Sequence, residues 1–86
     1  MKVFVVHVYD AADRLHDFYV HGTPEVAVRQ AAIDLVAGRF EDADPDFFLS
    51  EVNRVVAEAD FERPTGRRHV RCDSWHAHVD EMRVRG

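Results

Sequence analysis

Apolar and polar side chains alternate at the two ends of this chain, whereas apolar side chains recur at helical spacing in its middle. Residues 2–9 and 16–21 are short runs dense in β-branched and aromatic side chains, which is typical of strands. Alternation returns over residues 68–84, after two stretches whose apolar residues fall on one helical face. This pattern predicts a single domain over residues 1–86 with the element order β-β-α-α-β(β).

Two helix starts are marked by capping residues followed directly by proline. In the segment Gly22–Glu25, Thr23 can cap the helix, the proline can take its first turn, and the glutamate favours the positive end of the helix dipole. This first helix is expected to reach about Ala37, and a second one, starting at Asp44–Asp46, about Ala59. Their apolar faces hold Val28, Ala31, Ala32, Leu35 and Val36 in the first helix, and Phe48, Val52, Val55, Val56 and Ala59 in the second.

The last alternating segment is too long for one ordinary strand. We expect a turn near Asp73–Ser74 and a β-bulge near Asp80–Glu81, where the phase of the apolar positions changes. The predicted fold is therefore α+β: a small antiparallel sheet of three to four strands with two helices packed on one face. The expected sheet core consists of Phe4, Val6, Val8, Phe18, Val20, Trp75 and Val79.

The parity of the strand positions also predicts what the other face of the sheet carries. Pairing apolar with apolar positions places Val8 opposite Phe18 and Val6 opposite Val20, around a loop over residues 11–15. The opposite parity then points away from the helices, and its semi-apolar, aromatic composition is typical of a contact surface. The predicted surface comprises Val5, His7, Tyr9, Tyr19, His21, His76 and His78, with His16, which falls in the inward phase, at the rim.

All six histidines lie near the two chain ends, which raises the question of a metal site. His76 and His78 would project to the same side of a strand, and His7 or His21 could add a third nitrogen ligand for Zn²⁺, Ni²⁺ or Cu²⁺. The sequence offers no cysteine pair, and only Asp80 as a nearby carboxylate to orient an imidazole. We expect surface or interface histidines without a committed metal, and keep a His-rich transition-metal-binding domain as an alternative.

No arrangement of residues in the sequence predicts catalysis. Ser74 and His76 lie in a segment with the residue types of a hydrolytic triad, but in a strand they stand about 7 Å apart, too far for a nucleophile–base hydrogen bond. A nucleophile elbow and a glycine-rich phosphate loop are missing. The aspartates at 42, 44 and 46 have calcium-loop spacing without the loop's glycine and glutamate, so helix capping is the better interpretation. We expect a non-enzymatic protein without a cofactor.

The net charge and its distribution indicate which class of partner to expect. The formal net charge is −5, so direct nucleic-acid binding is not expected, because that affinity rests on neutralising phosphates. Residues 41–62 are rich in acids, and Glu51 and Glu58 on the second predicted helix could imitate a row of phosphates. A basic loop follows, and such a dipolar surface can steer a protein partner. Its arginines are Arg63, Arg67, Arg68 and Arg71.

Location is indicated only by what the chain lacks. No apolar run approaches the roughly 18 residues of a membrane span. The start runs directly into a strand pattern without the apolar segment of a signal peptide, and the single Cys72 cannot form an internal disulfide. We expect a cytoplasmic protein without a membrane contact.

The short, acidic, strand-first profile, with arginine favoured over lysine, resembles small accessory proteins of phages and mobile elements, including anti-CRISPR inhibitors, in size and composition. That resemblance implies an inhibitor that acts by surface contact. We predict a protein-binding module that uses the histidine and tyrosine face of the sheet or the acidic helix. Its partner would be another protein, such as a nucleic-acid-binding protein or complex, or a second copy in a homodimer. A self-associating structural accessory protein is a further alternative.

Overall fold

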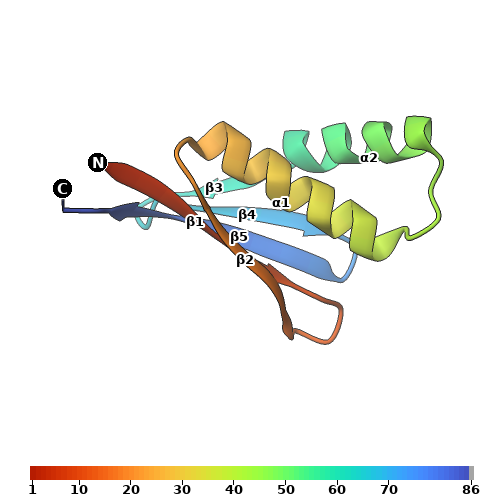
Figure 1. The fold of residues 1–86 in the computed structure, drawn as a ribbon, viewed down its shortest axis with the longest axis horizontal. Helices are drawn as coiled ribbons and strands as arrows, with labels where there is room; N and C mark the ends of the chain where they lie inside the picture. The colour runs from red at the N-terminus through yellow and green to blue at the C-terminus, as the bar shows by residue number, and fades with distance from the viewer. Residues whose placement is uncertain (86) are drawn as a thin grey trace.

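The computed structural model describes residues 1–85. These residues form one five-stranded antiparallel sheet and two helices, which confirms the predicted α+β class (Figure 1). The three-residue strand β3 was not expected. The sheet has the order β2-β1-β5-β4-β3. The elements are β1 (Lys2–Tyr9), β2 (Leu15–His21), α1 (Pro24–Arg39), α2 (Pro45–Ala57), β3 (Asp60–Glu62), β4 (Arg67–Cys72) and β5 (Trp75–Arg83).

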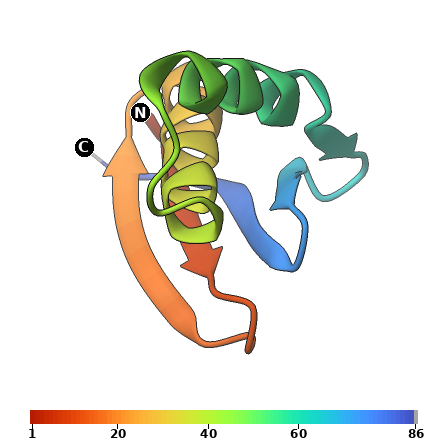
Figure 2. The ribbon, with the colours of Figure 1, turned by 90° about the vertical axis from the view of Figure 1, so that its right-hand side faces the viewer.

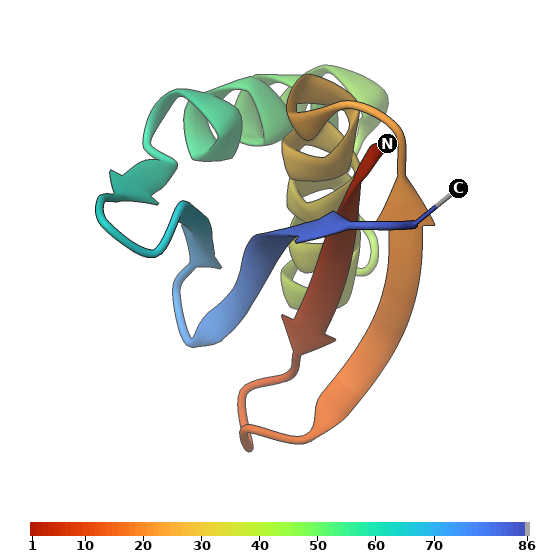
Figure 3. The ribbon, with the colours of Figure 1, turned by 90° about the vertical axis from the view of Figure 1, so that its left-hand side faces the viewer.

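Both helices lie on the same face of the twisted sheet, and β2 forms one of its edges (Figures 2 and 3). The buried side chains lie between the helices and this face, and neither helix of the described residues is long and apolar enough to cross a membrane. The core consists of Phe4, Val6, Val8, Ala27, Val28, Ala31, Ala32, Leu35, Val36, Val52, Val55, Val70, Cys72, Ala77 and Val79. Trp75 packs against its border.

The helix starts follow the predicted capping chemistry. The side chain of Thr23 accepts a hydrogen bond from the backbone N–H of Val26, and Pro24 is the first helical residue of α1. The side chain of Asp44 begins α2 in the same way, accepting from two backbone N–H groups. The ends differ slightly from expectation, because α1 continues two residues past Ala37 and α2 ends two residues before Ala59.

The predicted register of β2 against β1 is wrong by one residue. Val20 pairs with Val5 and Phe18 pairs with His7, so Val20 and Phe18 lie on the face away from the helices, 50% and 53% exposed. A β-bulge at His16 causes the shift, because one extra residue of β2 lies between two consecutive pairs. A one-residue slip sends every side chain of a strand to the opposite face. β2 tolerates this outcome because it is an edge strand, and its apolar side chains are not needed in the core.

The C-terminal hairpin follows the prediction in its turn but not in its bulge. Asp73, with φ of 54°, and Ser74 connect β4 to β5, as expected. The pairing of β1 with β5 is continuous from Lys2–Arg83 to Tyr9–His76, so the bulge predicted near Asp80–Glu81 is wrong. The change of apolar phase arises because Met82 is an exposed side chain rather than a core residue.

Candidate functional site

The sheet face that the helices leave uncovered gathers most of the histidines, and we call it the open face. Side chains alternate along a strand and cross-strand partners share a face, so the register assigns the members of this face. They are Val3, Val5, His7 and Tyr9 from β1; Leu15, Phe18 and Val20 from β2; His76, His78, Asp80 and Met82 from β5; Arg67, His69 and Arg71 from β4; and Asp60 and Glu62 from β3.

One row of side chains crosses all five strands at the centre of the open face. Phe18, His7, His78, His69 and Asp60 are successive cross-strand partners in the register. The ring of His7 meets the rings of Phe18 and His78 edge to face, with centroids 5.1 and 5.2 Å apart. Such aromatic contacts add to the free energy that is gained by burial of the rings. We call these five residues the central row.

Tyr9 lies beside the central row and connects it with His76. Its ring stacks on the ring of His76 at 5.2 Å, and it meets the ring of His78 edge-on at 5.3 Å. On the other side of the row, Val5 is only 7% exposed although no helix covers it. The middle of the open face is therefore a packed aromatic and aliphatic layer.

The β4 side of the open face is polar, and it contains two pairs of interacting side chains. The guanidinium of Arg67 donates two hydrogen bonds to the carboxylate of Asp80, at 2.7 and 3.3 Å. The Nε2 atom of His69 lies 2.8 Å from a carboxylate oxygen of Glu62. Partial burial lowers the pKa of His78, and the nearby charge of Arg67 lowers it further. Both effects favour the neutral form of the His78 imidazole.

The β2 side of the open face is apolar and unusually exposed. Four large apolar side chains on the open face are half exposed or more: Leu15 57%, Phe18 53%, Val20 50% and Met82 53%. Three of the four belong to β2, the edge strand next to the packed centre. A run of exposed apolar side chains on one face, next to a polar side, is typical of an interaction surface.

The structure brings five of the seven predicted face residues together and moves the other two away. Val5, His7, Tyr9, His76 and His78 lie on the open face. Tyr19 and His21 lie on the helix side instead, with Tyr19 packed against the core and its ring 5.3 Å from that of His21. Burial raises the pKa of the Tyr19 hydroxyl. Their placement on the predicted face was wrong because of the one-residue shift of β2, and His16 contacts Trp75 at the rim of the helix side.

Sequence reasoning missed Phe18, Val20 and His69 as members of the open face. The sequence held no signal for the first two, because their face depends on the bulge at His16. His69 alternates with the buried Val70 and Cys72, which indicates an outward strand position, but the surrounding arginines favoured a loop interpretation.

The acidic helix is less available than its sequence indicates. Glu51 lies on α2 and Glu58 directly follows its last residue, with Arg54 between them. The guanidinium of Arg54 contacts the two carboxylates at 2.7 and 2.6 Å. These hydrogen bonds lower the pKa of Glu51 and raise that of Arg54. The two candidate carboxylates are thus both engaged by an arginine of α2.

The arginines that follow α2 also do not form one patch. Arg67 lies on the open face, whereas Arg68 lies on the helix side, with its guanidinium 4.8 Å from the ring of Phe61. Ser74 is exposed in the β4–β5 turn, and no hydrogen bond joins it to His76 within the described residues. Cys72 is a buried free thiol, and burial raises its pKa.

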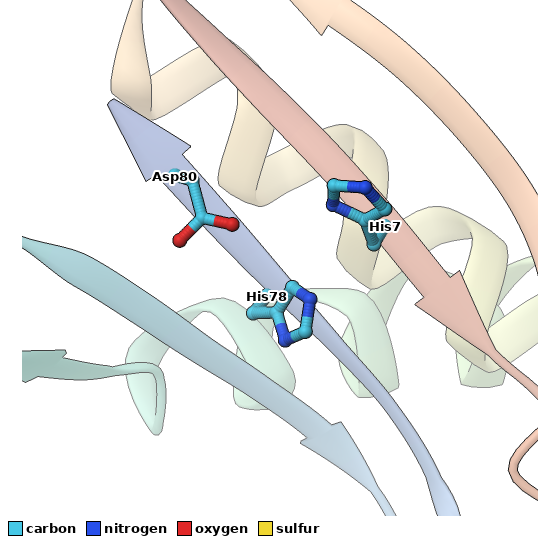
Figure 4. Close-up of side chains that lie close together, drawn as sticks. All are labelled: His7, His78 and Asp80. Carbon is cyan, nitrogen blue, oxygen red and sulfur yellow. The ribbon is translucent and has the colours of Figure 1, made fainter. Parts of the chain in front are cut away.

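The open face thus offers a large aromatic and apolar contact area and a set of imidazole and carboxylate donors. Within residues 1–85 it also holds the one group of three His, Cys, Asp or Glu side chains close enough to share an ion, namely His7, His78 and Asp80 (Figure 4). A comparison of the chain with protein-family models, curated proteins and solved structures finds no significant match.

Proposed function

We propose that this chain is a non-enzymatic protein-binding module that associates with a second copy of itself through the open face. The observation that carries the proposal is the exposure of Leu15, Phe18, Val20 and Met82, each 50% exposed or more, on one side of the sheet. Removing apolar surface from water contributes about 25 cal/mol per Å². Covering these four side chains is therefore a substantial driving force for association.

Charge favours a second copy as the partner. The open face carries the positive Arg67 and Arg71 against the negative Asp60, Glu62 and Asp80, which leaves a net charge of about −1 with neutral histidines, whereas the whole chain carries −5. Most of the acidic excess therefore lies outside this face. Two copies can approach here without strong repulsion of like charges.

Symmetry also allows the open face to complement itself. A twofold axis that runs across the strands places β2 on β2 and β1 on β1 of the partner copy. The apolar side then covers an apolar side, and Arg67 and Asp80 meet a polar side that is already paired. Aligned packing of two twisted sheets is an ordinary architecture.

The acidic helix has less support as the binding element. Glu51 and Glu58 would have to give up Arg54 before they could imitate phosphates for another protein. The proposal of a non-enzymatic role is supported by a face whose polar groups are mostly paired or stacked rather than arranged around a nucleophile. A cytoplasmic site of action fits the free, buried thiol of Cys72, which needs no oxidising compartment.

Matched valine variants test this function. Val20 lies on the open face and is 50% exposed, and Val26 lies on α1 and is 52% exposed. We expect light scattering to show a mass that rises with concentration toward that of a dimer for the natural chain and for Val26→Glu. Val20→Glu should remain a monomer, because a buried unpaired carboxylate opposes association. The measurement is made with a chelator present.

A monomer at all concentrations would contradict the proposal. So would a dimer that Val20→Glu leaves intact, because the association would then use another surface. Circular dichroism of both variants verifies that a variant that stays monomeric is still folded.

A further inference from the structure

The open face also brings together three metal-ligating side chains. His7 on β1 and His78 on β5 are direct cross-strand partners, and Asp80 follows two residues later on the same face of β5. Each offers one ligand atom, and these atoms all lie within 4.8 Å of one another (Figure 4). We propose that His7, His78 and Asp80 form a binding site for one divalent transition-metal ion, with Zn²⁺ as the ion that fits the donors.

The donor set defines this chemistry. Two imidazole nitrogens and one carboxylate oxygen are the protein ligands of many open zinc sites, in which the fourth position is left to water or another molecule. Tetrahedral Zn²⁺ holds its ligand atoms about 3.4 Å apart. Donors within 4.8 Å reach that spacing by rotations of the two rings and the carboxylate. The strands need not move.

The backbone around these side chains is well fixed. β1 and β5 pair over eight consecutive partners from Lys2–Arg83 to Tyr9–His76, and both strands lie inside the sheet. A site on such strands is held more precisely than one on loops. The three donors therefore begin close to their binding arrangement.

Hydrogen bonding leaves the imidazoles available. Within residues 1–85, Nδ1 of His7 is buried without a hydrogen-bond partner. A buried polar atom without a partner is costly, and a metal ion would satisfy it. Since no hydrogen bond of the described chain involves the ring of His78 either, both rings can turn toward an ion without breaking one.

Arg67 orients Asp80, the third metal-ligating side chain. Its guanidinium holds the carboxylate of Asp80 through two hydrogen bonds, and each carboxylate oxygen keeps a further lone pair. Such an outer partner orients a ligating carboxylate, as is usual in metal sites. Its positive charge opposes that of the ion, so the site should bind Zn²⁺ reversibly rather than permanently.

Thermal unfolding with Zn²⁺ tests the site, using the chain without a polyhistidine tag. The natural chain should unfold at a higher midpoint with about 100 µM Zn²⁺, and a chelator should reverse the rise, because an ion that binds only the folded state stabilises it. His7→Ala, His78→Ala and Asp80→Asn should each weaken Zn²⁺ binding at least tenfold in calorimetric titration. His76→Ala, which removes an imidazole of the same face outside the cluster, should bind Zn²⁺ like the natural chain.

The site is refuted if Zn²⁺ leaves the midpoint unchanged, if His78→Ala binds Zn²⁺ as tightly as the natural chain, or if His76→Ala loses binding equally. If a variant does not fold, the site is tested instead by nuclear magnetic resonance of the natural chain with ¹⁵N-labelled histidine. One equivalent of Zn²⁺ should then shift the ring nitrogens of His7 and His78 and leave those of His16 and His21 unchanged. The opposite pattern contradicts the assignment. Because self-association is measured with a chelator present, the result of that test does not depend on the metal site, and each proposal can fail without the other.

Discussion

Single residues of β2 take roles that their hydrophobicity alone would not give them. Val20 is half exposed on the open face, while Tyr19, with its polar hydroxyl, packs against the core. The bulge at His16 turns the Tyr19 ring toward the core, where it lies next to Asp34 of α1 and adds to a densely packed interior. Which side chains of β2 lie on the open face therefore depends on the path of the strand as well as on their polarity.

Asp34 on α1 is a partly buried carboxyl whose titration is expected to affect stability. Burial raises the pKa of its carboxyl, and the nearby Asp17 carboxylate raises it further, so the fold favours the protonated form. A raised pKa means that stability is full at low pH and is lost as pH rises through the folded pKa. We therefore expect Asp34→Asn to gain free energy of unfolding at pH 7, by no more than about 0.5 kcal/mol because the group is partly exposed.

Chemical denaturation at two pH values measures this effect. The gain of Asp34→Asn should disappear near pH 3, where the carboxyl of the natural chain is protonated in both states. Asp42→Asn, at an exposed position between the helices, is the matched control and should change little at either pH. A loss of stability in Asp34→Asn at pH 7 would argue against this role of the carboxyl.

At the level of the elements, α1 approaches the sheet closely at Gly38, next to Trp75 at the start of β5. A Cβ atom at Gly38 would lie 2.5 Å from the ring of Trp75, which itself borders the core. An alanine normally gains about 1 kcal/mol over glycine in a helix. Overpacking of this kind costs roughly 1–3 kcal/mol. We expect Gly38→Ala to destabilise the fold despite its better helix propensity.

The midpoint of urea unfolding shows whether the overpacking at Gly38 outweighs the gain in helix propensity. Gly22→Ala is the control, because nothing lies within 4 Å of a Cβ atom there. Tryptophan fluorescence should change in Gly38→Ala and not in Gly22→Ala. A stabilised Gly38→Ala would indicate that α1 and Trp75 separate without cost.

All elements except the short β3 could be predicted, whereas the placement of β2 could not. Thr23 and Asp44, each followed by proline, marked both helix starts, since capping is a local interaction. The buried alternation of β1 and β5 also decided their faces. The face of β2 depended on a bulge at His16 and on how far α1 reaches, and both are properties of the assembled fold. For that reason Phe18 and Val20 were missed as surface residues and Tyr19 and His21 were misplaced.

For the whole molecule, the two faces of the sheet differ in burial and composition. One face is covered by both helices and holds the buried core, and the other carries the central row, an apolar edge and a paired polar side. This composition, on a chain whose acidic groups lie mainly elsewhere, is the basis of the proposed self-association.

Isotope-filtered nuclear Overhauser measurements on a mixture of labelled and unlabelled chains test self-association most directly, because they report only contacts between copies. Association through the open face predicts contacts between copies from the side chains of Phe18, Val20 and Met82, and none from the exposed Leu49 of α2. Intermolecular contacts confined to the helices, or none at concentrations well above those used for light scattering, would contradict it.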